Sequence, residues 1–259
     1  MGDDVAARLA RYYDLDTLDA PDDVDRYLTL AAVESGPILE LAAGTGRLAV
    51  PLALAGHAVT AVDIDPAMLA RAHAAWQQAA PDAHPGGSLE VVEADLLTLA
   101  LRSRFGLVIF ALNSIFLLAT RDRQQAALTT MKRHLRPGGL AVVDVWLPHP
   151  DDLALYDGRL VLEWQREDEQ TGERVAKTHA ARFDSATAEV DLHALFDAWT
   201  PAGAVRRTAR HDRLRLVSAT ELTAMAEAAG LRVETVEGDH AGTPFGPGAE
   251  RAVLLARLV

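Results

Sequence analysis

The chain has 259 residues, 49% of them hydrophobic, which fits a globular protein with one large α/β domain and an insertion. Its formal net charge of −12 disfavours nucleic acid as a partner. The sequence contains no cysteine, which excludes disulfides, thiolate metal sites and cysteine nucleophiles. It also lacks an apolar run of membrane-spanning length and a secretion signal, so we expect a cytoplasmic protein with no membrane partner.

The first predicted elements are helices. Residues 4–33 have helical character on both sides of a loop at residues 15–21, which carries aspartates and a proline. Tyr12 and Tyr13 lie on the first helical part. We expect Tyr12 to pack this helix onto a sheet.

A strand–turn–helix–strand pattern follows, and the rest of the chain is organised around it. Its parts are, in order, an apolar run at 38–43, a glycine-rich turn with Gly44 and Gly46, a helix at 48–55 ended by Gly56, and a second apolar run at 58–62 that finishes on Asp63. The glycines let a ligand approach the backbone, and the helix start offers unpaired N–H groups. A carboxylate at the tip of the second strand can accept from both hydroxyls of a ribose. The pattern therefore predicts a site for an adenosine-containing ligand.

The glycine turn alone leaves the ligand open. Gly44, Gly46 and Ala49 fit the relaxed GxGxxG/A dinucleotide pattern, and Asp63 lies 19 residues after Gly44, near the spacing expected for NAD. An NAD(P)-dependent dehydrogenase is thus one alternative at this point.

The following elements continue an alternation of helices and strands. A helix is predicted at 66–80, with Asp65 as N-cap and Pro66 in its first turn, and a strand at 89–94 precedes Asp95. A fully apolar strand at 105–112 is typical of a central parallel strand and is followed by Asn113 and Ser114. After a helix at 121–134, the turn 136–139 introduces a strand that runs to 145. We expect Asp144, near the end of this strand, and Trp146 and His149 beyond it to complete the rim of the site.

The C-terminal part changes character. Residues 158–217 alternate apolar and polar positions and predict a small antiparallel β insertion. Its basic cluster, Arg206, Arg207, Arg210, Arg213 and Arg215, is either a solvated outer face or a grip on an anionic acceptor. A helix at 218–229, with Ser218 or Thr220 as N-cap, and two strands at 231–236 and 252–258 complete the prediction.

In combination, several motifs resemble the class I S-adenosylmethionine-dependent methyltransferases of the small-molecule type with a β insertion after the fifth strand. The segments that carry the resemblance are Glu40 to Gly46, Asp63, 94–96, 105–113 and 135–139, within residues 8–150, with a weaker return at 218–259. The resemblance implies a doubly wound, mostly parallel seven-stranded sheet of the Rossmann-like methyltransferase fold. We expect residues 1–150 and 218–259 to form it and residues 151–217 to form a lid over the acceptor site. Ala42 stands where the family usually has glycine, which is tolerable if its φ is negative.

The resemblance also implies the site residues. The expected cofactor, S-adenosyl-L-methionine, would be bound by Tyr13, Glu40, Ala42, Gly44, Gly46, Arg47, Asp63, Ile64, Met68, Asp95, Leu96, Leu112 and Asn113. A small-molecule acceptor would meet Asn113, Ser114, Trp146 and His149. The other interpretations are structural: ordinary core for Ile64, an N-cap for Asp95 and a solvated loop position for His149. No metal site is expected.

The expected chemistry is methyl transfer to a small molecule. Because an unprotonated amine needs no base, N-methylation by proximity and orientation is the first expectation. O-methylation with His149 or Asp144 as base is the alternative. A methyltransferase-fold cyclase and a regulatory binding module are also open, and a homodimer is an assembly that the sequence allows.

Overall fold

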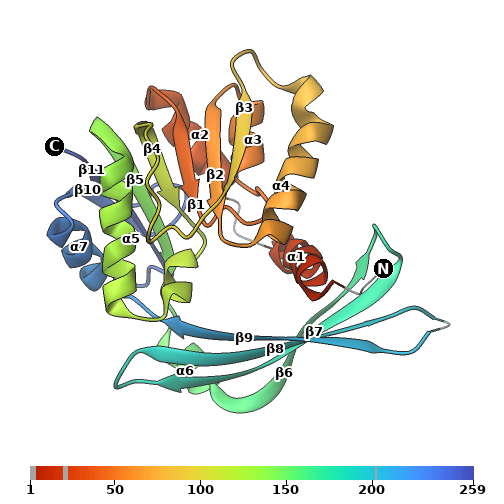
Figure 1. Ribbon diagram of the computed structural model, residues 1–259. Coiled ribbons are helices and arrows are strands. Elements are labelled where there is room, and N and C mark those ends of the chain that lie inside the picture. The colour runs from red at the N-terminus through yellow and green to blue at the C-terminus, as the bar shows by residue number, and fades with distance from the viewer. Residues whose placement is uncertain (1–3, 20–22, 202) are drawn as a thin grey trace. The chain divides into compact units, whose positions relative to one another are not determined.

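The computed structural model describes residues 4–19, 23–201 and 203–259, which fall into two compact units (Figure 1). One unit is Pro21–Leu147 with Val217–Val259, and the other is Met1–Ala20 with Pro148–Leu216. The N-terminal helix thus belongs to the same unit as the predicted insertion, whereas the sequence placed residues 1–150 in the methyltransferase domain.

The larger unit is built on a seven-stranded sheet. Its strands lie in the order β10 (Arg232–Glu237), β11 (Arg251–Arg257), β5 (Leu135–Trp146), β4 (Phe105–Phe110), β1 (Ile38–Leu41), β2 (Ala58–Asp63) and β3 (Ser88–Glu93). β1 to β5 pair in parallel, and β11 is antiparallel to both of its neighbours. This confirms the predicted mostly parallel sheet that closes with an antiparallel strand.

Helices cover both faces of this sheet. α2 (Val24–Val33), α3 (Ala49–Leu54) and α4 (Pro66–Ala79) lie on one face, and α5 (Arg121–His134) and α7 (Ala219–Ala228) lie on the other (Figure 1). Apolar side chains of α2 and α3 pack against β1, β2, β4, β5 and β11 to form one core. Because both faces are covered, every residue of β4 is buried, as its apolar sequence predicts. Two 3₁₀ turns, η2 (Ala80–Asp82) and η3 (Ser114–Leu118), complete the unit.

Two helix caps predicted from the sequence are present. The Asp65 side chain accepts a hydrogen bond from the Ala67 amide at the start of α4, and Pro66 occupies the first turn. Of the two candidates for α7, Ser218 is the N-cap, since its hydroxyl accepts from the Glu221 amide.

Two boundaries differ from the prediction. The expected loop at 15–21 is helical as far as the structure describes it, because α1 (Val5–Asp16) continues into η1 (Thr17–Asp19); Ala20 and Pro21 lie outside the described residues. The Thr17 hydroxyl donates to the Tyr13 carbonyl and closes the last turn of α1. The predicted turn at 136–139 lies inside β5, where the pairing with β4 shifts register and Gly138 has a φ of 75°.

The smaller unit is a four-stranded antiparallel sheet with one helix on it. Its strands are β6 (Asp157–Asp168), β7 (Glu173–Asp184), β8 (Glu189–Trp199) and β9 (Arg206–Arg215), paired in sequence order, and a short helix, α6 (Pro150–Ala154), precedes them. The predicted antiparallel β insertion is therefore confirmed. α1 packs on one face, where the ring of Tyr12 stacks on Phe196 with centroids 5.2 Å apart.

An ion pair also fastens α1 to this sheet. The Lys177 ammonium lies 2.7 Å from a carboxylate oxygen of Asp16, and the Trp164 indole donates to Asp16 at 2.8 Å. These contacts and the buried Tyr12 explain why residues of α1 are compact with the insertion. In the described part of the chain, no helix is long and apolar enough to cross a membrane.

Candidate functional site

The turn after β1 has the backbone geometry that its glycines predict. Gly44 and Gly46 have φ values of 56° and 83°, in the left-handed region that favours glycine. A β-carbon at Gly46 would also lie 3.0 Å from the Ala72 β-carbon and 3.1 Å from a Val50 methyl group. Space and conformation therefore both demand glycine at position 46, and the turn can bring backbone amides close to a ligand.

Asp63 ties the end of β2 to this turn. One carboxylate oxygen accepts from the Gly44 amide at 2.8 Å and the other from the Asp65 amide at 2.9 Å. An ionised carboxylate has about four acceptor positions. Two thus stay open for the hydroxyl groups of a ribose.

Ala42 differs from the condition attached to it in the sequence analysis. Its φ is 53°, so the alanine holds a left-handed conformation in which its methyl group is strained. The condition of a negative φ is therefore not met. Residues after it, from Ala43 onward, are fixed by hydrogen bonds such as Ala43 N–H to the Val62 carbonyl at 3.0 Å, which indicates that the turn imposes the conformation on Ala42.

Glu40 is a buried acid beside the turn. Glu40 is a residue of β1 and is only 4% exposed. Its Oε2 atom has no hydrogen-bond partner in the described structure. Burial raises the pKa of Glu40 to about 8, although the nearby Arg47 charge and the Ala49 amide oppose this shift. The unpaired oxygen is an acceptor position that a bound cofactor could satisfy.

Arg47 is held by an acid that the sequence analysis did not identify. Its guanidinium forms two hydrogen bonds to the buried carboxylate of Asp23, at 2.5 and 2.8 Å. Asp23 precedes α2, so this pair joins the start of α2 to the glycine turn. Neither the 24-residue separation nor the local pattern signals the contact.

The ends of β2 and β3 carry the residues predicted for the adenine side. The Ala94 amide donates to the Asp63 carbonyl at 2.9 Å, which brings the β3 end next to the β2 end. Asp95 caps the following turn by accepting from the Leu97 amide at 2.9 Å, so its structural interpretation is confirmed. Ile64 is 67% exposed rather than ordinary core. Met68, on α4, and Leu96 are partly buried.

The β4 end is strained. Leu112 and Asn113 have φ values of 49° and 63°, and both lack the freedom of glycine. The Asn113 side-chain oxygen accepts from the backbone N–H of Trp146 at 2.5 Å. The backbone N–H of Asn113 donates to the Asp144 carbonyl at 3.1 Å. Asn113 thus joins the ends of β4 and β5, and Ser114 follows it as the first residue of η3. Consecutive strained residues are characteristic of functional sites.

Asp144 is buried in an ion pair rather than placed on the rim as predicted. The residue is fully buried, and Arg251 on β11 binds both of its oxygens, at 2.7 and 2.8 Å. His240 lies beside it, with Nε2 3.3 Å from Asp144 Oδ2. Burial alone raises the pKa of Asp144, but His240 and the Arg251 charge outweigh it and hold that pKa below its ordinary value. Asp144 is therefore an ionised carboxylate that already has partners.

Two predicted site residues belong to the smaller unit. Tyr13 is partly buried on α1, and its carbonyl accepts from Thr17. His149 is the N-cap of α6: its Nδ1 accepts from the Asp151 amide at 3.3 Å, and its side chain is 72% exposed. The roles of both residues in ligand binding stay predictions.

Three of the five arginines in the basic cluster of the insertion have acidic partners. Arg206 lies 2.9 Å from Glu173, Arg207 binds Asp197 through two hydrogen bonds, and Arg210 lies 2.7 Å from Asp212. These pairs favour the solvated outer face over the anion grip.

Comparison with known proteins agrees with this geometry. A family profile described as a methyltransferase domain matches residues 38–139. The chain is 30% identical to a cypemycin N-terminal methyltransferase from Streptomyces sp, over 80% of this chain and 77% of that protein. It is 29% identical to a dTDP-3-amino-3,4,6-trideoxy-alpha-D-glucopyranose N,N-dimethyltransferase from Streptomyces venezuelae, over 81% of each.

Solved structures show the same architecture. The CcbJ methyltransferase from Streptomyces caelestis superposes with a TM-score of 0.75 at 27% identity, over 93% of this chain and 96% of that one. A S-adenosylmethionine-dependent methyltransferase from Clostridium acetobutylicum ATCC 824 shares the fold, with a TM-score of 0.80 at 17% identity over 95% and 97%. The fold, the family profile and the relatives define a Rossmann-like transferase with an adenosine-containing cofactor. The chain belongs to the S-adenosylmethionine-dependent methyltransferases, and its cofactor is S-adenosyl-L-methionine.

Proposed function

We propose that this enzyme methylates an amine nitrogen of a small-molecule acceptor. The relatives that support the proposal are named as an N-terminal methyltransferase and an N,N-dimethyltransferase of an amino sugar nucleotide. The first name gives an N-terminus and the second an amino sugar nucleotide as the acceptor, and in both the methylated group is an amine.

The residues of the larger unit fit the cofactor. Asp63 has acceptor positions left for the ribose hydroxyls, and Glu40 offers an unpaired buried oxygen near the turn of Gly44 and Gly46. Asp95 and Leu96 stand at the β3 end for the adenine. The other members of the proposed cofactor set are Ala42, Arg47, Ile64, Met68, Leu112 and Asn113 in the larger unit and Tyr13 in the smaller unit. The proposed acceptor set consists of Asn113, Ser114, Trp146 and His149.

The observation that carries the N-methylation proposal is the engagement of the carboxylates. Asp144 accepts from Arg251 with both oxygens and is therefore not placed to take a proton from an acceptor, and the open acceptor positions of Asp63 are assigned to the ribose of the cofactor. The cofactor supplies a methyl group on a positively charged sulfur. An unprotonated amine can accept that group without a base, and the chain then has to align the acceptor and exclude water.

O-methylation is the second candidate. It needs a base, and the candidate is the His149 imidazole, whose side chain is 72% exposed. A pH–rate profile of a His149 variant separates the candidates.

Three further expectations belong to this proposal. Residues 151–217 would act as a lid over the acceptor site, the enzyme would work in the cytoplasm, and a homodimer is an allowed assembly. A variant lacking residues 158–215 tests the lid: it should lose turnover and keep some cofactor binding.

The decisive experiment begins with calorimetric titration of the purified protein with S-adenosylmethionine, S-adenosylhomocysteine and NAD. We expect the first two to bind and NAD to give no heat. The protein is then incubated with S-adenosylmethionine and matched acceptors that carry either an amine or a hydroxyl at the same position. A mass gain of about 14 Da per transfer on the amine only supports the proposal. Gain on the hydroxyl only, or a product formed without mass gain, contradicts it.

A further inference from the structure

The smaller unit carries a group of metal-ligating side chains that methyl transfer does not use. His193 on β8 and His211 on β9 are directly opposite each other in the antiparallel register. Asp191 lies two residues before His193, so the alternation of a strand places it on the same face. This face is opposite to the one that carries Phe196 and α1, because positions 191 and 193 alternate with the buried positions 194 and 196.

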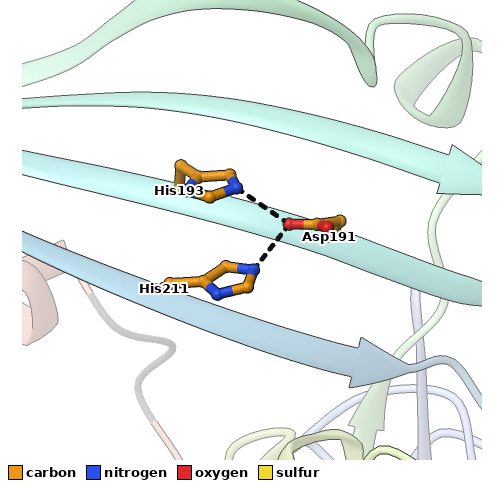
Figure 2. Close-up of side chains that lie close together, drawn as sticks. All are labelled: Asp191, His193 and His211. Atoms are coloured by element: carbon orange, nitrogen blue, oxygen red, sulfur yellow. Dashed lines mark hydrogen bonds and ion pairs between the residues drawn. The ribbon is translucent and has the colours of Figure 1, made fainter.

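The three side chains converge on one point. Nε2 of His193 lies 3.1 Å and Nε2 of His211 lies 2.7 Å from the same oxygen of Asp191 (Figure 2). The two imidazole rings are stacked, with centroids 4.2 Å apart and planes 7° from parallel. Both histidine side chains are more than half exposed, at 58% and 52%, so an ion from solvent can reach them.

The geometry points to a binding site for a divalent first-row transition-metal ion, with His193, His211 and Asp191 as its protein ligands. Two imidazoles and a carboxylate are a donor set that suits Zn²⁺ and Ni²⁺ and leaves the remaining positions to water. In an octahedral ion with bonds of about 2.1 Å, neighbouring ligand atoms are about 3.0 Å apart. The separations of 3.1 and 2.7 Å between each imidazole nitrogen and the carboxylate oxygen are close to that value, and all three ligand atoms lie within 4.8 Å of one another.

The charges around the site are compatible with a cation. The hydrogen bond from His211 and the nearby positive charges lower the pKa of Asp191, so its carboxylate is ionised at neutral pH. Arg213 is opposite Asp191 on β9 and weakens cation binding through its charge. Arg182 is opposite Asp191 on β7. Its guanidinium lies against Gly158 of β6, since a β-carbon added to Gly158 would be 2.6 Å from Arg182 Nε.

The other cluster of similar composition does not suit a metal. Asp23, Asp144 and His240 also have ligand atoms close together, but Arg47 and Arg251 already bind the two carboxylates. A dication there would displace buried arginine partners. The described residues form two such groups. Of these, only the group of Asp191, His193 and His211 has ligand atoms that solvent can reach.

Calorimetric titration of the full chain with ZnCl₂ and NiCl₂ tests the site, after removal of any histidine tag and dialysis against a chelator. We expect one saturable event per chain with each ion and none with MgCl₂, since Mg²⁺ prefers oxygen ligands. His193→Ala and His211→Ala should each weaken binding more than about tenfold. Arg213→Gln, which leaves all three ligands in place, should tighten it.

Controls separate the site from general histidine binding. His73 on α4 is an exposed histidine that contacts Gln77, and His73→Ala should leave the affinity unchanged. Circular dichroism checks that each variant is folded, and His211→Gln repeats the ligand loss with a side chain closer in size. The proposal is overturned if Zn²⁺ and Ni²⁺ give no saturable binding, if the His193 and His211 variants bind as tightly as the parent, or if His73→Ala loses as much affinity.

Discussion

The carboxylate of Asp63 and the amide of Gly44 form a 2.8 Å hydrogen bond that joins the end of β2 to the turn after β1. The other Asp63 oxygen accepts from Asp65, so one side chain shapes both the glycine turn and the start of α4. A residue proposed to bind the ribose is therefore also a structural support. Its substitution has consequences with and without cofactor.

Asp63→Ala should weaken S-adenosylmethionine binding by about 1–3 kcal/mol, because a ribose hydroxyl loses its partner and the Gly44 amide loses its acceptor. Calorimetric titration of the folded variant measures the loss. Asp65→Ala is a matched control, since it removes the α4 cap and should cost about 1 kcal/mol of stability with little change in affinity. Unchanged affinity in folded Asp63→Ala would remove this residue from the site.

Ala42→Gly should stabilise the protein by up to about 1 kcal/mol. Relief of the left-handed strain, about 1–2 kcal/mol, exceeds the entropy cost of an added glycine. Urea unfolding of the protein without cofactor measures the difference. A loss of stability would show that the methyl group makes packing contacts that outweigh the strain.

Glu40 should make the cofactor-free protein less stable as pH rises. Its pKa is raised to about 8 by burial, so between pH 4.5 and 8 the folded state keeps a proton that the unfolded state has lost. The free energy of unfolding then falls with pH, by at most about 1.4 kcal/mol per unit from this group. Urea unfolding between pH 5 and 8 should show a smaller decrease for Glu40→Gln. Parallel curves for the two proteins would contradict a neutral Glu40.

Arg251→Ala should be strongly destabilising, by about 3–5 kcal/mol, because it leaves the buried Asp144 carboxylate without its main partner. Asp144→Asn combined with Arg251→Ala should recover part of that loss, and a double-mutant cycle in urea gives the coupling. Additive losses would show that the two groups do not depend on each other.

The same pair fixes the sign of an acid effect. The pKa of Asp144 in the folded state lies below its unfolded value of about 3.9. Its contribution to the free energy of unfolding is therefore complete above the unfolded pKa and is lost as pH falls through the folded pKa. Asp144→Asn should therefore flatten the acid limb of the stability curve.

His149→Ala should leave the height and shape of the pH–rate profile unchanged if an amine is methylated by proximity. The variant should lose at most about 1 kcal/mol of stability, because the cap of a short exposed helix is removed. His149→Asn restores a capping side chain without an imidazole and serves as the control. Disappearance of the acidic limb in both variants, where the rate falls as a base takes up a proton, would instead identify His149 as a base.

Local patterns were sufficient for much of the fold. The alternation of strands and helices, the apolar β4 and the caps Asp65 and Ser218 depend on neighbours a few residues apart, and each was predicted. The closeness of Asp63 to the glycine turn follows for the same reason, since its spacing from Gly44 is a property of one strand–turn–helix–strand unit.

Long-range pairs could not be predicted in this way. Asp144 looked like a rim residue because its partner Arg251 is 107 residues further along the chain. The φ of Ala42 is imposed by the turn and leaves no signal in an alanine. The convergence of His193 and His211 depends on the register of β8 with β9, which the alternation of either strand does not fix.

The position of β11 has a consequence for synthesis. β11 follows β10 in the chain but lies between β10 and β5 in the sheet. Until residues 251–257 have emerged from the ribosome, β10 has no strand to pair with, and Asp144 lacks its ion-pair partner Arg251. The parallel strands β1 to β5 can assemble during translation, but this edge of the sheet closes only after the β11 segment has emerged. A nascent chain stalled before that point would expose an unpaired strand edge, the kind of surface that chaperones protect.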